Sequence, residues 1–285
     1  MTLTETASEN STTRAAATRA TADAGSVAGS TTGTAVPLEE IVRFCDERSR
    51  RRAVKDFPGA VNGLQFFKRG PVRKIAAAVD SGLVPFQEAA RRGADFLIVH
   101  HGLFWNPQQP VTGAVYEKYR VLFDNDIALY SCHLPLDAHQ EIGNNALLAV
   151  ALGLRVERWF LPYEGVPMAA LCAGGIARDA FAARLKTLFP RTYTGIEFGS
   201  ERPEKIAVLT GSGRSVLDAL DAEGCDTLVT GELREEHFNM AQEHRWNLYP
   251  CGHNATETFG VDALGREAAA KFGLPYEFIE TGCPL

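Results

Sequence analysis

Short apolar runs alternate with amphipathic segments along residues 74–153, and this alternation constrains the fold more than any other feature of the chain. We expect three strands, at 74–79, 95–101 and 127–133. We expect three helices between and after them, at 83–93, 116–125 and 143–153. Continuous apolar strands separated by helices are typical of βαβ units, whose sheets are covered on both faces. The predicted fold class is therefore α/β.

The same alternation returns after residue 204, and the two stretches can be aligned with each other. KIAAAVDSG (74–82) matches KIAVLTGSG (205–213), and ADFLIVHH (94–101) matches CDTLVTGE (225–232), both at an offset of 131 residues. Further on, LYSCHLPLD (129–137) matches LYPCGHNATE (248–257). We therefore predict an internally duplicated α/β unit, with two similar halves that each contain a sheet flanked by helices.

The chain divides into three segments by composition and by this repeat. Residues 1–35 are rich in Thr, Ala, Ser and Gly and contain almost nothing large and apolar, so we expect a disordered tail. We place the first α/β half at 36–153 and the second at 154–285. Within the second half, a strand at 168–176 and a helix at 179–189 precede the repeated part.

Composition excludes several classes of function. The net charge is −6, from 29 basic and 35 acidic residues, which argues against broad binding to the phosphate backbone of nucleic acid. The sequence lacks any run of roughly 18 apolar residues, the length that would indicate a membrane span. Its six cysteines form no CxxC pair, so a thiolate zinc site is not indicated, and the reducing cytoplasm is the simplest compartment.

Histidines and carboxylates gather in three short clusters, VHHG (99–102), HLPLDAH (133–139) and GHNATE (252–257). Each cluster begins where an expected strand ends, and ligand sites of α/β sheets lie beyond the carboxyl ends of strands. The spacing of His133 and Asp137 recurs in His253 and Glu257. Imidazole and carboxylate together suit zinc, iron or manganese. The predicted metal ligands are His100, His101, Asp137, His253 and Glu257.

Five protein ligands exceed what one tetrahedral catalytic metal needs, so we predict two divalent ions per subunit. Glu257 is the candidate bridge, because a carboxylate offers two oxygens. His100 and His101 are adjacent and would point to opposite sides of a strand, so both can be ligands only if the backbone turns there, which Gly102 makes easy. The alternative is that the paired histidines are hydrogen-bonded loop residues.

Two further residues are candidates for proton transfer. Glu232 ends an expected strand, with Asp80 near the same cleft, although an ordinary solvated carboxylate would have the same pattern. His133 is the second candidate, and its alternative role is to orient a ligand by a hydrogen bond. His237 and His244 lie on an expected exposed helix, where we predict solvated side chains.

The chain resembles the GTP cyclohydrolase 1 type 2 family, the Nif-three-like dinuclear-metal proteins, in five segments. These segments are VNGLQ (61–65), GADFLIVHHGLFW (93–105), LYSCHLPLDAHQEIGNNALLA (129–149), DTLVTGE (226–232) and GHNATETFGVDALG (252–265). The resemblance implies the same five metal ligands, two similar α/β halves and a ring-shaped homohexamer. It also implies opening of a guanine ring by metal-activated water, with GTP as the named substrate.

Two functional hypotheses follow. In the first, the protein is a metal-dependent hydrolase that acts on a small molecule, in particular a nucleotide. In the second, it is a non-catalytic metal-binding hexamer with a regulatory or metal-handling role. A site that leaves ligand positions open to water favours the first hypothesis, and five ligands over two ions leave such positions.

Overall fold

The computed structural model describes residues 34–105, 107 and 109–285. The expected disordered tail lies outside the described residues except for its last two positions. The described chain forms two sheets, each covered by helices on both faces. Along the described part of the chain, every helix is too short or too polar to cross a membrane.

The first sheet has five strands in the order β1-β4-β3-β2-β11. Their bounds are β1 Gly63–Phe66, β2 Ile75–Asp80, β3 Phe96–His101, β4 Ala128–Ser131 and β11 Tyr276–Phe278. Strands β4, β3, β2 and β11 are parallel, whereas β1 runs antiparallel to β4. Side chains of a strand alternate between its two faces, so Ile75 and Ala77 pack on one core and Ala76 and Ala78 on the other.

Four helices cover the first sheet. Helices α1 (Leu38–Arg48) and α10 (Thr258–Phe272) pack on one face through residues such as Ile41 and Leu264. Helices α2 (Leu83–Arg91) and α3 (Gly113–Asp124) pack on the other, through Phe86 and Leu122. A short 3-10 turn, Arg51–Ala53, follows α1.

The second sheet has six strands in the order β5-β6-β8-β9-β10-β7. Their bounds are β5 Arg155–Tyr163, β6 Val166–Ala173, β7 Ile196–Glu197, β8 Lys205–Ser212, β9 Thr227–Glu232 and β10 Asn247–Pro250. Strands β8, β9 and β10 are parallel, and the remaining pairings are antiparallel. Helices α5 (Asn144–Ala151) and α6 (Arg178–Leu188) cover one face, and α7 (Arg214–Leu220) and α8 (Glu236–His244) the other.

The two halves share part of their topology, and the α/β architecture confirms the predicted fold class. In each half three parallel strands follow one another in the order of the chain, β2-β3-β4 and β8-β9-β10. A short antiparallel strand lies beyond the third strand in both halves, β1 beside β4 and β7 beside β10. The offset seen in the sequence thus corresponds to a repeated strand order.

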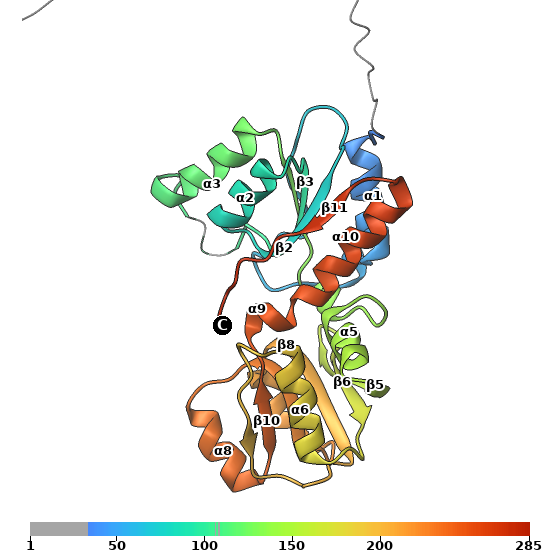
Figure 1. The fold of residues 1–285 in the computed structure, drawn as a ribbon, viewed down its shortest axis with the longest axis vertical. Helices are drawn as coiled ribbons and strands as arrows, with labels where there is room; N and C mark the ends of the chain where they lie inside the picture. The colour runs from blue at the N-terminus through green and yellow to red at the C-terminus, as the bar shows by residue number, and fades with distance from the viewer. Residues whose placement is uncertain (1–33, 106, 108) are drawn as a thin grey trace, which may run out of the picture. The chain divides into compact units, whose positions relative to one another are not determined.

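The last elements of each half pack against the sheet of the other half. Helix α5 closes the predicted first half but packs on the second sheet, where Leu148 joins the core. Helix α10 and strand β11 end the chain but belong to the first sheet, beside β2 (Figure 1). This exchange joins the halves in space. The boundary at residue 153 is therefore proposed only as the boundary between the two repeats of the sequence.

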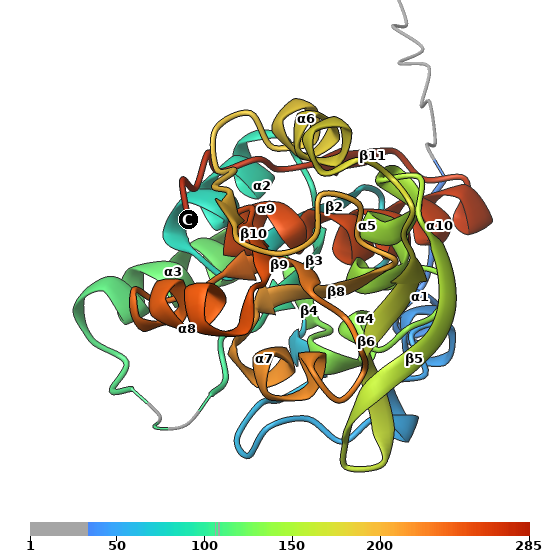
Figure 2. The same ribbon diagram turned by 90° about the horizontal axis from the view of Figure 1, so that it is seen from below.

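Two one-turn helices stand at the carboxyl ends of the parallel strands. Helix α4 (Leu134–Asp137) follows β4, and α9 (His253–Thr256) follows β10. Figure 2 shows α9 beside the ends of β8 and β9, which it contacts. The three His/carboxylate clusters are therefore carried by these strand ends and short helices.

Candidate metal centre

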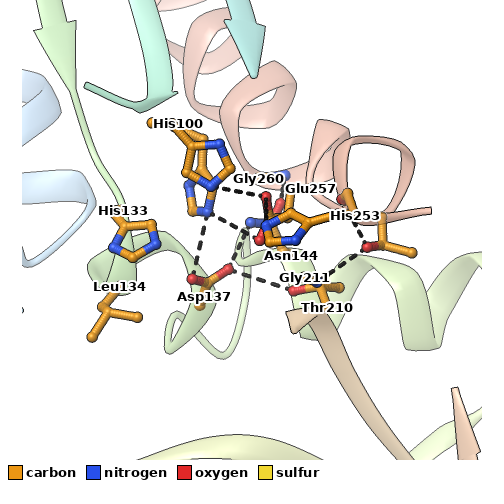
Figure 3. A network of polar contacts seen from close by, with 12 residues as sticks. His100, His133, Leu134, Asp137, Asn144, Thr210, Gly211, His253, Glu257 and Gly260 are labelled. Atoms are coloured by element: carbon orange, nitrogen blue, oxygen red, sulfur yellow. Dashed lines mark hydrogen bonds and ion pairs between the residues drawn. The ribbon is translucent and has the colours of Figure 1, made fainter. Parts of the chain in front are cut away.

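The five predicted ligands converge between the two sheets. His100 and His101 end β3, Asp137 ends α4, His253 begins α9, and Glu257 lies between α9 and α10. Two groups of potential ligand atoms have all members within 4.8 Å of one another: His100, Asp137 and Glu257, and His101, His253 and Glu257. Figure 3 shows His100 and His253 pointing toward Asp137 and Glu257. Glu257 is common to both groups.

The two carboxylate oxygens of Glu257 face different imidazoles. Oε1 lies 3.6 Å from Nε2 of His100. Oε2 lies 3.1 Å from Nε2 of His101 and 3.2 Å from Nε2 of His253. The carboxylate of Asp137 approaches the first group, with Oδ2 at 3.5 Å from Nε2 of His100. One buried carboxylate therefore has a different set of neighbours at each oxygen.

The imidazoles of this cluster are held from behind by their Nδ1 atoms. His100 Nδ1 donates to the carbonyl oxygen of Cys132 at 2.9 Å. His101 Nδ1 lies 2.7 Å from Oδ1 of Asp80, and His253 Nδ1 lies 3.2 Å from Oε1 of Glu232. Partners of this kind fix the tautomer and the ring orientation of metal-binding histidines. The Nε2 atoms are thereby left to face the centre of the cluster.

Two atoms of the cluster are buried without a hydrogen-bond partner among the described residues. They are Nε2 of His100 and Oε2 of Glu257. Buried polar atoms nearly always have a partner, so each unpaired atom calls for an explanation. A cation bound among imidazole nitrogens and carboxylate oxygens would satisfy both atoms. The residues present therefore fit a divalent metal ion.

Charges within the cluster are strongly coupled. Burial alone would raise the pKa of Glu257, but His100, His101 and His253 hold it well below its ordinary value. Burial opposes charge on His253 as well, yet the adjacent carboxylates of Glu257 and Glu232 raise its pKa to about 9. A metal bound by these imidazoles would compete with protons, so its binding should weaken as the pH falls.

Glycines let Glu257 approach the ends of β8 and β9. Gly211 has a φ of +64°, and a Cβ atom there would overlap Oε1 of Glu257. A Cβ on Gly231 would lie 2.7 Å from Oγ1 of Thr256 and 2.8 Å from Cα of His253. Only a residue without a side chain leaves this space to α9 and Glu257.

The expected turn between His100 and His101 does not occur, because β3 includes both residues. Their rings nevertheless lie 4.8 Å apart, and both reach Glu257. Glu257 approaches the very end of the strand, so it contacts the side chains of both final residues.

His133 lies beside the cluster and is held by a buried carboxylate. Its Nδ1 lies 2.9 Å from Oδ1 of Asp56, and its backbone N–H donates to Oδ1 of Asn62 at 2.7 Å. Asp56 also accepts hydrogen bonds from the side chain of Asn62 and the backbone of Leu134. Burial alone would raise the pKa of the Asp56 carboxyl, but these contacts hold it below its ordinary value. One nitrogen of His133 forms a third potential ligand group with His100 and His101.

Glu232 faces away from the centre of the cluster. Its carboxylate lies beside Nδ1 of His253, the nitrogen opposite to the one that faces Glu257. Asp80 occupies the equivalent place behind His101, and its second oxygen accepts a hydrogen bond from Asn254 at 2.7 Å. The geometry of Glu232 is thus that of an orienting carboxylate.

Sequence reasoning missed the amides that tie the site to both sheets. Asn144 donates to Oδ1 of Asp137 at 2.8 Å and accepts from the backbone of Gly260 in α10. Asn145 donates to the carbonyl oxygens of Asp137 and Met168 and accepts from the backbone of Thr210. Asp56 was missed as well. A single Asp or Asn in a turn or at a helix start has no periodic signal by which it could be found.

Outside the cluster, one expectation about surface histidines is wrong. His237 is buried, with Nδ1 accepting a hydrogen bond from the backbone of Arg234 at the start of α8. His244 is exposed as expected, and it pairs with Asp221.

Two similar α/β halves with a His/carboxylate cluster between them make this an α/β protein with a candidate metal site, and comparison with known families gives the family. Residues 36–283 match the Duf34/NIF3 (NGG1p interacting factor 3) family, to which the chain belongs.

Relatives of known sequence or structure cover most of the chain. The GTP cyclohydrolase 1 type 2 homolog of Deinococcus radiodurans is 38% identical over 85% of this chain and 92% of its own length. The protein of the same name from Escherichia coli K12 is 34% identical over 86% and 98%. The crystal structure of TTHA1606 from Thermus thermophilus has a TM-score of 0.78 and 37% identity, covering 88% of this chain and all of that one. A solved protein described as ybgI, of unknown function, has a TM-score of 0.79 and 33% identity, with the same coverage.

Proposed function

We propose that the protein is a hydrolase that holds two divalent metal ions per subunit. The observation that carries this proposal is the position of Glu257, whose oxygens face two separate groups of ligand atoms. In the proposal His100 and Asp137 would hold one ion, His101 and His253 would hold the other, and Glu257 would contribute to both. Zinc, iron and manganese all accept this donor set.

We propose that the chain's own residues orient the ligands and move protons. When bound, such metals lower the pKa of water to roughly 7 and polarise oxygen atoms of a substrate. Asp80 and Glu232 hold Nδ1 of His101 and His253 and so keep Nε2 of each ring inward. His133, held by Asp56, is the proposed residue that takes up or releases a proton at its Nε2.

We propose a nucleotide as the substrate, with GTP the first to test and hydrolytic opening of the guanine ring as the reaction. Support comes from the family and from relatives that bear the name GTP cyclohydrolase 1 type 2 homolog. We also keep the homohexamer and the cytoplasmic location as proposals. Apolar side chains such as Phe67, Phe123 and Val150 are exposed, and contacts between subunits would bury apolar area of this kind.

The experiment that tests this proposal measures metal content and turnover together. Elemental analysis of the purified full-length protein is followed by incubation of the metal-loaded form with GTP, with formate and phosphate release recorded separately. The same measurements are made on His101→Ala and on His244→Ala, an exposed histidine outside the cluster. Light scattering gives the number of subunits in the same samples.

We expect about two metals per chain and product release that is lost in His101→Ala but retained in His244→Ala. Two metals per chain without formate or phosphate release from GTP would contradict the proposed GTP hydrolase and favour the non-catalytic, metal-handling alternative. Failure to bind metal even after reconstitution would overturn the whole proposal.

A further inference from the structure

A cavity of about 300 Å³ opens beside the metal centre. His133, Asp137, His253 and Glu257 form its inner end. Most of its remaining wall is apolar and consists of Phe57, Leu134, Leu161, Tyr163, Met168 and Leu209. Cavities that hold drug-sized ligands measure roughly 300–1,000 Å³, so this one suits a small group rather than a whole nucleoside triphosphate.

The charge of the wall is unsuited to phosphate. None of the described residues that line the cavity is a lysine or an arginine, and Asp137 and Glu257 are its carboxylates. Proteins recognise phosphate groups with arginine, lysine or backbone N–H groups at helix ends. Without bound metal, a triphosphate inside this cavity would meet these carboxylates and apolar carbon instead. The hydroxyls of Ser212 and Ser215 offer hydrogen bonds to an uncharged polar group.

Aromatic rings from both halves of the chain form one side of the cavity. The rings of Phe57 and Tyr163 meet edge to face with centroids 5.1 Å apart, and Phe57 lies 5.7 Å from the ring of His133. Phe57 precedes β1 of the first sheet, whereas Tyr163 ends β5 of the second. Phe57 is 45% exposed although it is large and apolar. Such a ring is available to stack against a planar ligand.

The wall also includes a residue of β5 in an unfavourable backbone conformation. Leu161 has a φ of +59°, in the left-handed region that residues other than glycine rarely adopt. Strained residues of this kind cluster at ligand sites, where surrounding structure holds them in place. The Leu161 side chain lines the cavity in this conformation.

We propose that this cavity binds the uncharged planar ring of the substrate and leaves any phosphate groups outside. The choice of a purine as that ring rests on the proposed function. Phe57 and Leu161 are then residues that determine specificity for the ring. A nucleoside and its triphosphate should consequently bind the metal-free protein with similar affinity.

The test uses calorimetric binding to the full-length chain, both metal-loaded and treated with a chelator. In the chelator-treated protein we expect guanosine and GTP to bind within about threefold of each other and inorganic tripolyphosphate not to bind. In both forms we expect Leu161→Gly and Phe57→Ala to weaken guanosine binding about tenfold. Glycine accepts the φ at position 161, and Phe57 is nearly half exposed, so both variants should fold. Phe123→Ala, which removes a more exposed ring on α3, should leave binding unchanged.

Three results would overturn the inference: no guanosine binding by either form, tripolyphosphate binding to the metal-free chain, or guanosine affinity unchanged in both cavity variants. A protein that binds no metal or turns over no GTP, yet still binds guanosine and binds it more weakly after Leu161→Gly, would contradict the proposed hydrolase. The same result would support the cavity assignment. The two proposals therefore fail on different measurements.

Discussion

Gly211 and Glu257 occupy adjoining space so closely that a Cβ atom on Gly211 would overlap Oε1 of the carboxylate. Gly211 ends the buried part of β8, and Glu257 precedes α10, which packs on the other sheet. Among the described residues, Glu257 is the only carboxylate that belongs to both groups of ligand atoms. Its position depends on the absence of a side chain at Gly211.

We predict that Gly211→Ala loses most of its bound metal, because the added methyl group displaces Glu257. Gly175→Ala is the matched control, since Gly175 has a φ of +86° but no atom within 4 Å of an added Cβ. Both variants pay the backbone cost of a left-handed alanine, about 1 kcal/mol of the free energy of unfolding. Elemental analysis and thermal unfolding of the pair separate the two effects. Equal metal content in both variants would show that Glu257 tolerates displacement.

Substitution of Asp80 should change the affinity of the site for metal. It accepts from Nδ1 of His101 and from Asn254, so it fixes one proposed ligand and the start of α9 together. We expect Asp80→Asn to weaken metal binding by about 10- to 100-fold, measured by competition with a chromophoric chelator. Asp221→Asn is the control, because Asp221 pairs with the exposed His244 in the same way. Unchanged affinity in Asp80→Asn would remove the orienting role.

Asp56 should affect turnover rather than metal content. It holds Nδ1 of His133 at 2.9 Å, and an amide at this position would place a second donor or a weaker acceptor against that ring. With the proton-transfer residue misoriented, we expect Asp56→Asn to keep its metals and lose about 100-fold in kcat. Metal analysis and single-turnover kinetics on the same preparation test this, again with Asp221→Asn as control. Should the metals be lost instead, His133 would act as a ligand and not in proton transfer.

The order of strands and helices could be predicted from the sequence because it depends on local patterns. Apolar runs such as 95–101 became β3, and the constant offset of 131 residues corresponds to the repeated strand order. The exchange of α5 and α10 between the halves could not be predicted. It depends on which sheet offers a matching apolar surface, and that is decided by packing between residues far apart in the chain.

The candidate site shows the same division between local and distant information. Histidines at strand ends were predicted to meet, because the carboxyl ends of parallel strands lie at one edge of a sheet. The direction of a side chain at such an end was not predictable, and Glu232 accordingly faces the outer nitrogen of His253. His237 was expected at the surface because its helix is polar, yet a hydrogen bond to the backbone of Arg234 holds it inside.

The cysteines give a prediction about pH. Five of the six are buried, and only Cys283 is partly exposed. Burial raises the pKa of the Cys172 and Cys251 thiols to about 12, and it also raises the pKa of Cys45 and Cys225. A raised pKa keeps a thiol protonated below that value, and only the thiolate reacts with alkylating reagents.

We therefore expect iodoacetamide to label one thiol per native chain at pH 8, and all six after unfolding in guanidinium chloride. Raising the pH to 9.5 should not increase the number of adducts on the native chain. A thiol with a pKa of about 12 is still less than about 1% ionised at that pH, and burial also blocks the reagent. Cys283→Ser should abolish native labelling, and intact-mass spectrometry counts the adducts. A second adduct on the native chain at pH 8 would mean that one of three buried cores opens on the timescale of the reaction, and peptide mapping would identify it. Cys45 and Cys132 report on the core around β4, and Cys172 and Cys251 on the core between α5, α6 and the second sheet. Cys225 reports on the core between the second sheet, α7 and α8.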